Sequence, residues 1–421
     1  MAPKDHVNVA QDTYNVAPGA QGVDSSAGGT TAMTIAAFFG DVDVVRYLCD
    51  LPLHCGFSPS ADGNRAIVYA ALNGHVDVIR CLCDLPLDRG VDPSVNGNIA
   101  IQHAASNGHV DVVRFLCDLP LDRGVDPSAG YNTALLDAAQ NGHVDVVRCL
   151  CDLPLHRRAD PSTQGSRAIW LAAREGHMNV VQYLCGLPPH RGVNPSGCNN
   201  LAIVKAASRG HVDVVRYLCE LPPQRGVNPS TANNRAIKHA ASNGHLEVVK
   251  YLCDLPLNRG VDPSTCVVTC AASKGKLDVV RYLCDLPLNR GVDPSADHNS
   301  AIQEAARLGR LDVVRYLRDL PPHRGVEPSA RSIVTQAAPP SRHQLRVVRY
   351  LSTWPAMQSS FSAMHMEKFH NHFPSIVARR MARLPVLALC ALDMRVAIGA
   401  HKGGHDAEEA VVGDTAALPA V

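Results

Sequence analysis

Apolar residues recur along the chain with a spacing that predicts pairs of short helices. Around Gly108, the first apolar stripe has the spacing i, i+1, i+4 and i+5 and consists of Ala100, Ile101, Ala104 and Ala105. A second stripe follows Gly108 and consists of Val110, Val113, Leu116 and Cys117. Glycine suits the left-handed conformation that ends a helix, and Pro120 stops the second helix because proline lacks an N–H. The pattern predicts two helices and then an extended return through GVDPS and a few Gly/Asn-rich residues.

This unit is repeated along the chain at a nearly constant period. The glycine between the two stripes recurs every 34 residues, except for one step of 31 between Gly244 and Gly275, at Gly40, Gly74, Gly108, Gly142, Gly176, Gly210, Gly244, Gly275 and Gly309. The sequence therefore predicts nine regular units, followed by a degenerate tenth, RSIVTQAAPPSRHQLRVVRYL. The shorter step indicates either a kink or a tolerated deletion.

The core of the unit resembles the ankyrin repeat. AASNGHVDVVRFL (104–116) and AASNGHLEVVKYL (240–252) are similar to the A-A-x-x-G-H-x-(D/E)-V-V core of that family. The resemblance implies an all-α, ankyrin-type helical repeat solenoid. We expect a disordered N-terminal tail at 1–28, repeats 1–9 at 29–329, the degenerate tenth repeat at 330–352 and a partly helical or disordered extension at 353–421.

The sequence departs from the family in one tetrapeptide. T-P-L-H reads R-A-I-V at 65–68 and R-A-I-W at 167–170. In the family, the Thr and His of this tetrapeptide join neighbouring repeats by hydrogen bonds, and here only Thr31 and Thr133 remain at the first position.

Potential metal ligands and charged pairs recur in most units, which indicates structural roles. We expect the cysteine of L-C-D, such as Cys83, to fill the core, with zinc binding as the alternative. The G-H histidine, such as His75, stands at a helix start where other units have Asp, Lys or Arg, so we interpret it as structural. Asp77–Arg80 and Asp111–Arg114 have the i,i+3 spacing of exposed ion pairs.

Composition narrows the class of protein. The formal net charge is +1 and the sequence pI is about 7.6, which gives no long-range field for nucleic acid or an anionic membrane. The first thirty residues lack a signal-peptide core, and the apolar run at 384–392 is too short to span a bilayer. We expect a soluble, non-secreted protein of the cytoplasm or nucleus, without cofactor, metal or membrane contact.

Partner-binding candidates lie where the units differ from one another. The resemblance places the first helix and the return at a concave groove, and the variable positions flank the Ala-Ala pair. Successive middle repeats carry an aromatic and basic set: Tyr131, Trp170, Arg174, Lys205, Arg209 and Lys238. Tyr69 and His239 are further candidates, directly before the Ala-Ala pair of their units. Tyr, Trp and Arg often dominate interfaces, so we hypothesise a patch for an acidic partner segment. Alternatively, Trp170 fills the space left by the missing tetrapeptide histidine.

The two ends of the chain leave further alternatives. Phe38 and Phe39 stand where other units have polar residues, and either the N-terminal tail caps them or they are exposed. His365, His370 and His372 in the C-terminal extension do not have a family metal spacing. We find no unrepeated catalytic constellation and expect a non-catalytic protein–protein interaction scaffold. The alternative is an adaptor that presents targets to an enzyme through 353–421, and the third is a nucleic-acid-associated repeat protein.

Overall fold

The structure is a computed structural model that describes most of the repeat region. The described residues are 25–51, 58–86, 89, 91–154, 157, 159–256, 259, 261–263, 266–287, 292–321 and 342–351. The expected extension at 353–421 lies outside them. So does the expected tail up to residue 24, and the first described helix begins at Ser25.

The described residues form nine helix pairs followed by one more helix, and no strand occurs among them. The first helices are α2 (Ser25–Phe39), α4 (Ala61–Asn73), α6 (Val95–Ser106), α8 (Ala129–Asn141), α10 (Thr163–Glu175), α12 (Gly197–Arg209), α14 (Thr231–Asn243), α16 (Val267–Ser273) and α18 (Ala296–Arg307). The second helices are α3 (Val42–Asp50), α5 (Val76–Cys83), α7 (Val110–Asp118), α9 (Val144–Asp152), α11 (Met178–Gly186), α13 (Val212–Glu220), α15 (Leu246–Asp254), α17 (Leu277–Asp285) and α19 (Leu311–Arg318). The final helix is α21 (Arg342–Leu351). The predicted all-α helical repeat solenoid is confirmed.

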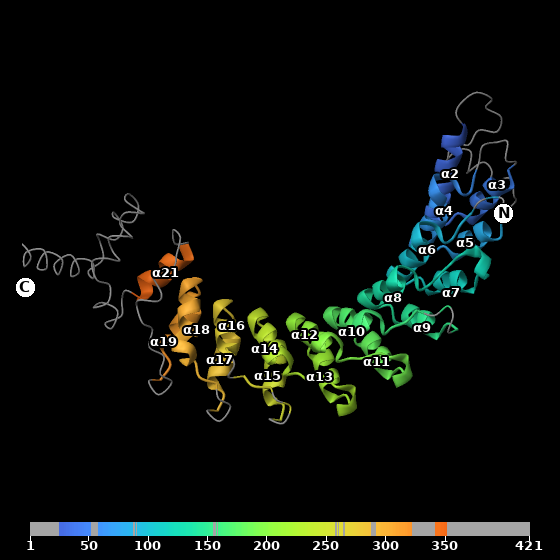
Figure 1. Ribbon diagram of the computed structural model, residues 1–421. Helices are drawn as coiled ribbons and strands as arrows, with labels where there is room; N and C mark the ends of the chain where they lie inside the picture. Colours follow the sequence, from blue (N-terminus) through green and yellow to red (C-terminus); the bar gives the residue numbers. More distant parts are fainter. Residues whose placement is uncertain are drawn as a thin grey trace, which may run out of the picture. The chain divides into compact units, whose positions relative to one another are not determined.

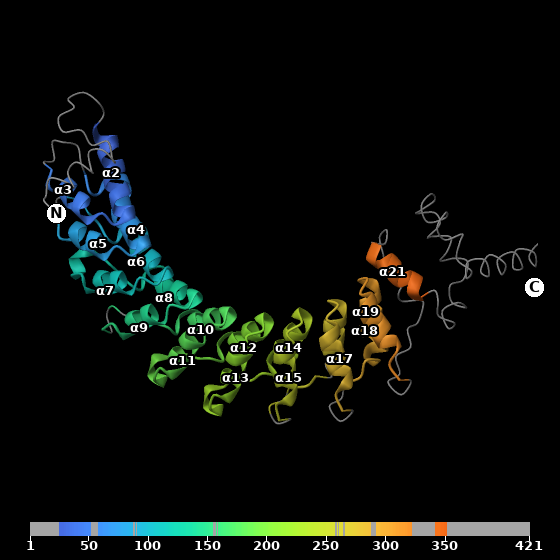
Figure 2. The ribbon, with the colours of Figure 1, turned by 180° about the vertical axis from the view of Figure 1, so that it is seen from behind.

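The chain divides into two compact units. Unit 1 comprises Met1–Ala271 and Asp278–Asp293, and unit 2 comprises Ala272–Leu277 and Pro294–Val421. In unit 1, each first helix from α2 to α14 packs against the first helices of the adjacent repeats, and the second helices from α3 to α15 form a parallel row (Figures 1 and 2). In unit 2, α18 and α19 pack against each other and against α21.

The core consists of the residues that recur in every unit. Ala104 and Ala105 are fully buried, which lets neighbouring first helices approach closely. Leu116 is also fully buried, which stabilises the fold by about 2 kcal/mol relative to an exposed leucine. The eight L-C-D cysteines are buried, so their predicted core role is confirmed. Burial raises the pKa of the Cys83 thiol to about 12.

The residues at the start of seven first helices differ from the expected extended return. Asp62, Gly63 and Asn64 have φ of 52°, 66° and 60°, which makes a left-handed turn at the start of α4. The same turn occurs in α6, α8, α10, α12, α14 and α18. Glycine and asparagine tolerate this conformation better than other residues, which explains why the segment is rich in both.

The third residue of the turn joins neighbouring repeats. In six units this residue is polar and buried: Asn64, Asn98, Asn132, Ser166, Asn200 and Asn234. Its side-chain oxygen accepts a hydrogen bond from the backbone N–H of the residue 28 positions later, at 2.8–3.0 Å. This contact between repeats was not predicted from the sequence.

The G-H histidine makes a second contact between repeats. His143 donates from Nε2 to the carbonyl oxygen of Ser106 at 3.0 Å. The equivalent bond is made by His75, His109, His177, His211 and His245. In unit 2, Arg310 stands at this position and its Nε donates to the carbonyl oxygen of Ser273 at 3.1 Å. The predicted structural role is confirmed, and Arg310 shows that another N–H donor can replace the histidine.

An arginine of the return makes a third contact. Arg191 donates to the carbonyl oxygen of Cys151 at 2.7 Å, and Arg259 donates to that of Cys219 at 2.7 Å. Arg89 makes the same bond to the oxygen of Cys49 at 2.9 Å. The last carbonyls of a helix have no partner within it, so these arginines satisfy acceptors that would otherwise remain open. Together the asparagine, histidine and arginine contacts join repeats that lack the Thr and His of the family tetrapeptide.

Candidate functional site

The predicted binding residues lie along the row of first helices in unit 1. Phe38 and Phe39 end α2, Tyr69 is on α4, and Tyr131 lies in the left-handed turn of α8. The others are on the next three first helices: Trp170 and Arg174 on α10, Lys205 and Arg209 on α12, and Lys238 and His239 on α14. We call this row of helices the first-helix face.

Trp170 is half-buried between two arginines of its own helix. The guanidinium carbons of Arg167 and Arg174 each lie 5.9 Å from the centre of the indole ring. At this distance a cation interacts favourably with the face of an aromatic ring. Trp170 occupies the position of the missing tetrapeptide histidine, and the ring also anchors two positive charges at the surface.

Some variable positions do not face the groove that the resemblance implied. Leu136, Leu171 and Val204 are buried, with exposed fractions of 6%, 3% and 3%. They stand at the two positions before the Ala-Ala pair, where we expected groove-lining residues. That expectation is wrong for these three, because an apolar side chain at these positions packs into the stack.

Arg174 does not present a free charge. Its Nε donates to Oε1 of Glu175 at 2.5 Å, and both side chains are about one-third exposed. The contribution of such an exposed pair to stability is small, about 0–1 kcal/mol. Its effect on the site is to neutralise part of the charge beside Trp170.

Lys205 and His239 lie close together on neighbouring first helices. Burial, with the positive charges of Arg235 and Lys205, lowers the pKa of His239, so its imidazole is neutral at neutral pH. Arg235 donates from Nε to Nε2 of His239 at 3.2 Å, which requires that nitrogen to be an acceptor. His239 therefore orients Arg235 and adds no charge of its own.

Positive charge is concentrated on three consecutive first helices. α10, α12 and α14 carry six basic residues against one acidic residue, Glu175: Arg167, Arg174, Lys205, Arg209, Arg235 and Lys238. We call these six residues the basic face. By contrast, α13 and α15 on the other row each carry one more acidic than basic residue. The near-zero net charge of the chain therefore hides a local separation of charge.

Two residues of the basic face, Arg167 and Arg235, were missed as candidates. Both precede the variable position by three residues and so lie on the same side of the helix. The signal was the Arg of the R-A-I triplet, which recurs in several units. Arg167 also opposes the effect of burial, which raises the pKa of Asp137 on the neighbouring helix α8.

Tyr131 is highly exposed, at 77%, and it adopts φ 59° in the left-handed turn. A left-handed conformation costs an ordinary residue about 1–2 kcal/mol. Because Tyr131 belongs to this turn, its ring lies at the start of α8 and not among the helical positions of the basic face.

Phe38, Phe39 and Tyr69 form a separate aromatic cluster on α2 and α4. The ring of Phe38 lies 5.1 Å from that of Phe39 and 5.9 Å from that of Tyr69, both edge-to-face. Phe38 is 40% exposed and Phe39 is 68% exposed. The expected cap, the N-terminal tail, lies outside the described residues up to residue 24. The structure does not bring this cluster together with the basic face, since α6 and α8 separate them in the row.

The described residues offer neither a metal site nor a membrane span. Within the described ranges, no three His, Cys, Asp or Glu side chains are grouped so that they could hold a metal ion. None of the described helices is long and apolar enough to cross a membrane. The histidines of the C-terminal extension lie outside the described residues.

The match to a protein-family model agrees with the repeat architecture. A family profile of ankyrin repeats, three copies long, matches at residues 16–92, 51–131, 87–161, 119–196 and 169–265. An ankyrin repeat family protein from Legionella pneumophila is similar in structure, with 20% sequence identity and a TM-score of 0.28, over 74% of this chain and 90% of that chain. No curated protein matches the chain. Ankyrin repeats generally mediate protein–protein interactions and are typically non-catalytic. From its helix pairs and the profile match across residues 16–265, the chain belongs to the ankyrin repeat family.

Proposed function

We propose that the chain is a non-catalytic scaffold that binds an acidic segment of a partner protein through the basic face. The observation that carries this proposal is the concentration of six basic side chains on three consecutive first helices, where Arg167 and Arg174 flank the half-buried Trp170. By resemblance to the family, the first helices line the concave side of the solenoid, where a partner segment would lie along several repeats.

The unpaired state of these charges supports the proposal. Within the described residues, Lys205, Arg209 and Lys238 have no ion-pair partner, whereas Arg174 is paired with Glu175. Like charges on neighbouring helices repel one another, and an acidic segment would relieve that repulsion. Trp170, on the first of the three helices, supplies an apolar surface for a contact beside these charges.

Two alternative functions have less support. Nucleic acid is also an anion, but acidic residues alternate with basic ones on the second helices, and the basic face is confined to three repeats. The adaptor hypothesis depends on 353–421, outside the described residues, and no described contact favours it.

A pair of charge-reversal variants tests the proposal. Fluorescence anisotropy would follow a fluorescein-labelled polyglutamate peptide bound to the full chain at low salt. We expect Lys205→Glu/Lys238→Glu to weaken binding at least about tenfold, equivalent to about 1.4 kcal/mol. The control, Arg46→Glu/Lys250→Glu, changes the net charge equally on second helices and should leave binding within about twofold.

The outcome against the proposal is equally specific. Equal weakening in both double variants would show that net charge alone attracts the peptide. Tighter binding of a single-stranded oligonucleotide of matched charge, lost in the same variant, would favour the nucleic-acid hypothesis instead.

A further inference from the structure

The second helices of unit 1 carry a ladder of arginine and aromatic residues. The guanidinium carbon of Arg80 lies 5.1 Å from the ring centre of Phe115, in the next repeat. Arg148 lies 5.4 Å from the ring of Tyr183, and Arg216 lies 4.9 Å from that of Tyr251. In each case the ring comes 35 residues after the arginine. The ladder thus places one aromatic ring under the arginine of the preceding repeat.

Cys149 interrupts this ladder. It stands where Phe115 and Tyr183 stand in their repeats, so no ring lies under Arg114. Arg114 instead forms an ion pair with Asp111 of its own helix, at 3.3 Å. Arg80, which lies over Phe115, makes no ion pair with Asp77 among the described residues, so the predicted Asp77–Arg80 pair is wrong. The guanidinium stacks on a ring where one is present and turns to its own helix where none is.

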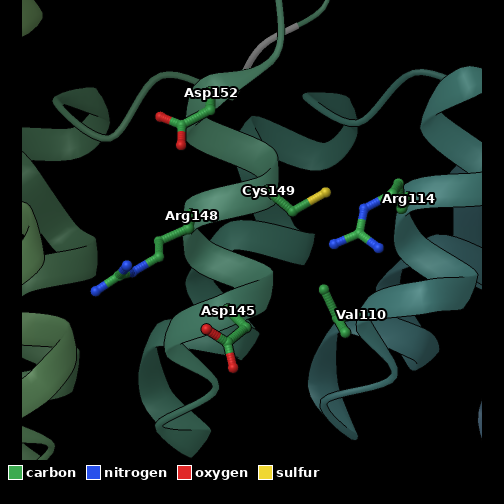
Figure 3. Close-up of a pocket in the computed structure, with 6 residues that line it drawn as sticks. All are labelled: Val110, Arg114, Asp145, Arg148, Cys149 and Asp152. Carbon is green, nitrogen blue, oxygen red and sulfur yellow. The ribbon is translucent and has the colours of Figure 1, made fainter.

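A cavity remains at the position of the missing ring. Its volume is about 450 Å³, within the range of roughly 300–1,000 Å³ that is typical of binding pockets. The cavity is lined by Val110, Arg114, Asp145, Arg148, Cys149 and Asp152. Figure 3 shows the thiol of Cys149 and the guanidinium of Arg114 pointing toward each other across the space between α9 and α7.

The neighbouring repeat shows what such a cavity accepts. Tyr183 lies under Arg148, and its hydroxyl donates to the carboxylate of Asp152 at 3.0 Å. The residues equivalent to Arg148 and Asp152 at the cavity are Arg114 and Asp118, because both stand 34 positions earlier. Burial raises the pKa of the Cys149 thiol, and the charge of Asp118 contributes in the same direction. A neutral thiol therefore lines the cavity, and Asp118, which is not among the lining residues, lies near enough to affect the pKa of that thiol.

We propose that the cavity at Cys149 binds a tyrosine side chain of a partner protein. The ring lies under Arg114 and against Val110, and the hydroxyl donates to Asp118. One repeat later, Tyr183 lies under Arg148 and donates to Asp152 in the same way. The partner's tyrosine thus repeats the contact that Tyr183 makes with Arg148 and Asp152 within the chain. The cavity lies on the row of second helices and the basic face lies on the row of first helices. The test of this proposal is therefore independent of the function proposed above.

Cys81 provides an internal control for this assignment. It also replaces the ring, and Arg46, which would lie over it, is paired with Asp43 at 3.4 Å. However, the interaction of the Cys81 thiol with that of Cys49 lowers the pKa of Cys81 to about 7, whereas the pKa of Cys149 is raised. Cysteine in the ladder is therefore not sufficient by itself for the proposal, which depends on the cavity beside Cys149.

The proposal is tested with N-acetyl-L-tyrosinamide as the probe. Methyl NMR spectra of the valine-labelled full chain would follow the Val110 signals during titration. We expect a saturable shift with the tyrosine amide and none with the alanine amide. Cys149→Tyr should abolish the shift because the chain's own ring fills the cavity, whereas Cys81→Tyr should leave it unchanged.

Further measurements test the folding of the variant, the class of ligand and the contact with Asp118. The melting temperature of Cys149→Tyr should equal or exceed that of the original chain, which shows that the variant is folded. A short glycine-flanked tyrosine peptide should bind at least as well as the amide. If the cavity excludes the peptide, the ligand is a small aromatic compound and not a protein.

The tyrosine amide should bind about two- to fivefold more tightly than the phenylalanine amide, and equal binding would overturn the Asp118 contact. An unsaturable Val110 shift, or the same shift in Cys149→Tyr, would overturn the site itself.

Discussion

The side-chain oxygen of Asn200 accepts a hydrogen bond from the backbone N–H of Asn228, 28 residues later, at 2.8 Å. Asn200 is buried and adopts φ 58°, so one residue both closes a left-handed turn and holds the next repeat. Its amide nitrogen also donates to the hydroxyl of Thr231 at 2.8 Å. The stack is thus joined by a specific polar contact as well as by apolar packing.

Replacing Asn200 should therefore destabilise the stack strongly. Asn200→Ala leaves the N–H of Asn228 without its acceptor, which costs about 1–3 kcal/mol. Asn200→Ser should cost less, because Ser166 performs this role in another repeat and its hydroxyl accepts from the N–H of Asn194 at 2.8 Å. Urea unfolding followed by circular dichroism measures the difference. Equal losses in the two variants would contradict a role for the side-chain acceptor.

A second prediction concerns the glycine between the helices. Gly108 has φ +81°, and a Cβ there would lie 2.5 Å from Nδ1 of His143. Gly108→Ala should displace that ring and break its bond to the carbonyl of Ser106, in addition to straining the backbone. Gly97→Ala is the control, since φ is +69° but nothing lies within 4 Å of the added Cβ. We expect Gly108→Ala to lower the free energy of unfolding by about 1 kcal/mol more than the control, measured in the same urea titration.

The sequence predicted the helix pairs well, because their signal is local and repeated. The stripe from Val110 to Cys117 and the glycine before it determine which residues form a helix and which face is buried. The contacts between repeats were harder to predict. These contacts depend on the left-handed turn. The turn was not predicted because no periodic spacing of apolar residues marks it in the sequence. A polar residue that recurs beside R-A-I, such as Asn64 or Asn234, was the available signal.

The candidate site was predicted in part. Trp170, Lys205 and Lys238 lie on the first-helix face as expected, because equivalent positions in a repeat share a face. Burial of the neighbouring variable positions was not predicted, since a single unit does not show which side chains its neighbours cover. Arg80 illustrates a second limit: helix spacing favoured a pair with Asp77, but a ring in the next repeat takes its place.

The two cysteines of the ladder should differ in reactivity. The hydrogen bond with Cys49 lowers the pKa of the Cys81 thiol to about 7, whereas burial raises the pKa of Cys149. The thiolate is the nucleophile, so Cys81 is partly ionised at neutral pH while Cys149 stays protonated until the pH is higher. Iodoacetamide labelling followed by peptide mass spectrometry should modify Cys81 first at pH 7, with the difference narrowing as pH rises. Cys49→Ala should raise the pKa of Cys81 and slow its labelling.

The most direct test of the central claim uses Trp170 as its own reporter. The chain has a second tryptophan, Trp354, so the measurement is made on Trp354→Phe. Titration with polyglutamate should change the fluorescence of Trp170 saturably, and the change should weaken as salt screens the charges. It should disappear in Lys205→Glu/Lys238→Glu and persist in Arg46→Glu/Lys250→Glu. Peptide binding that leaves Trp170 fluorescence unchanged would contradict the claim that the basic face is the binding site.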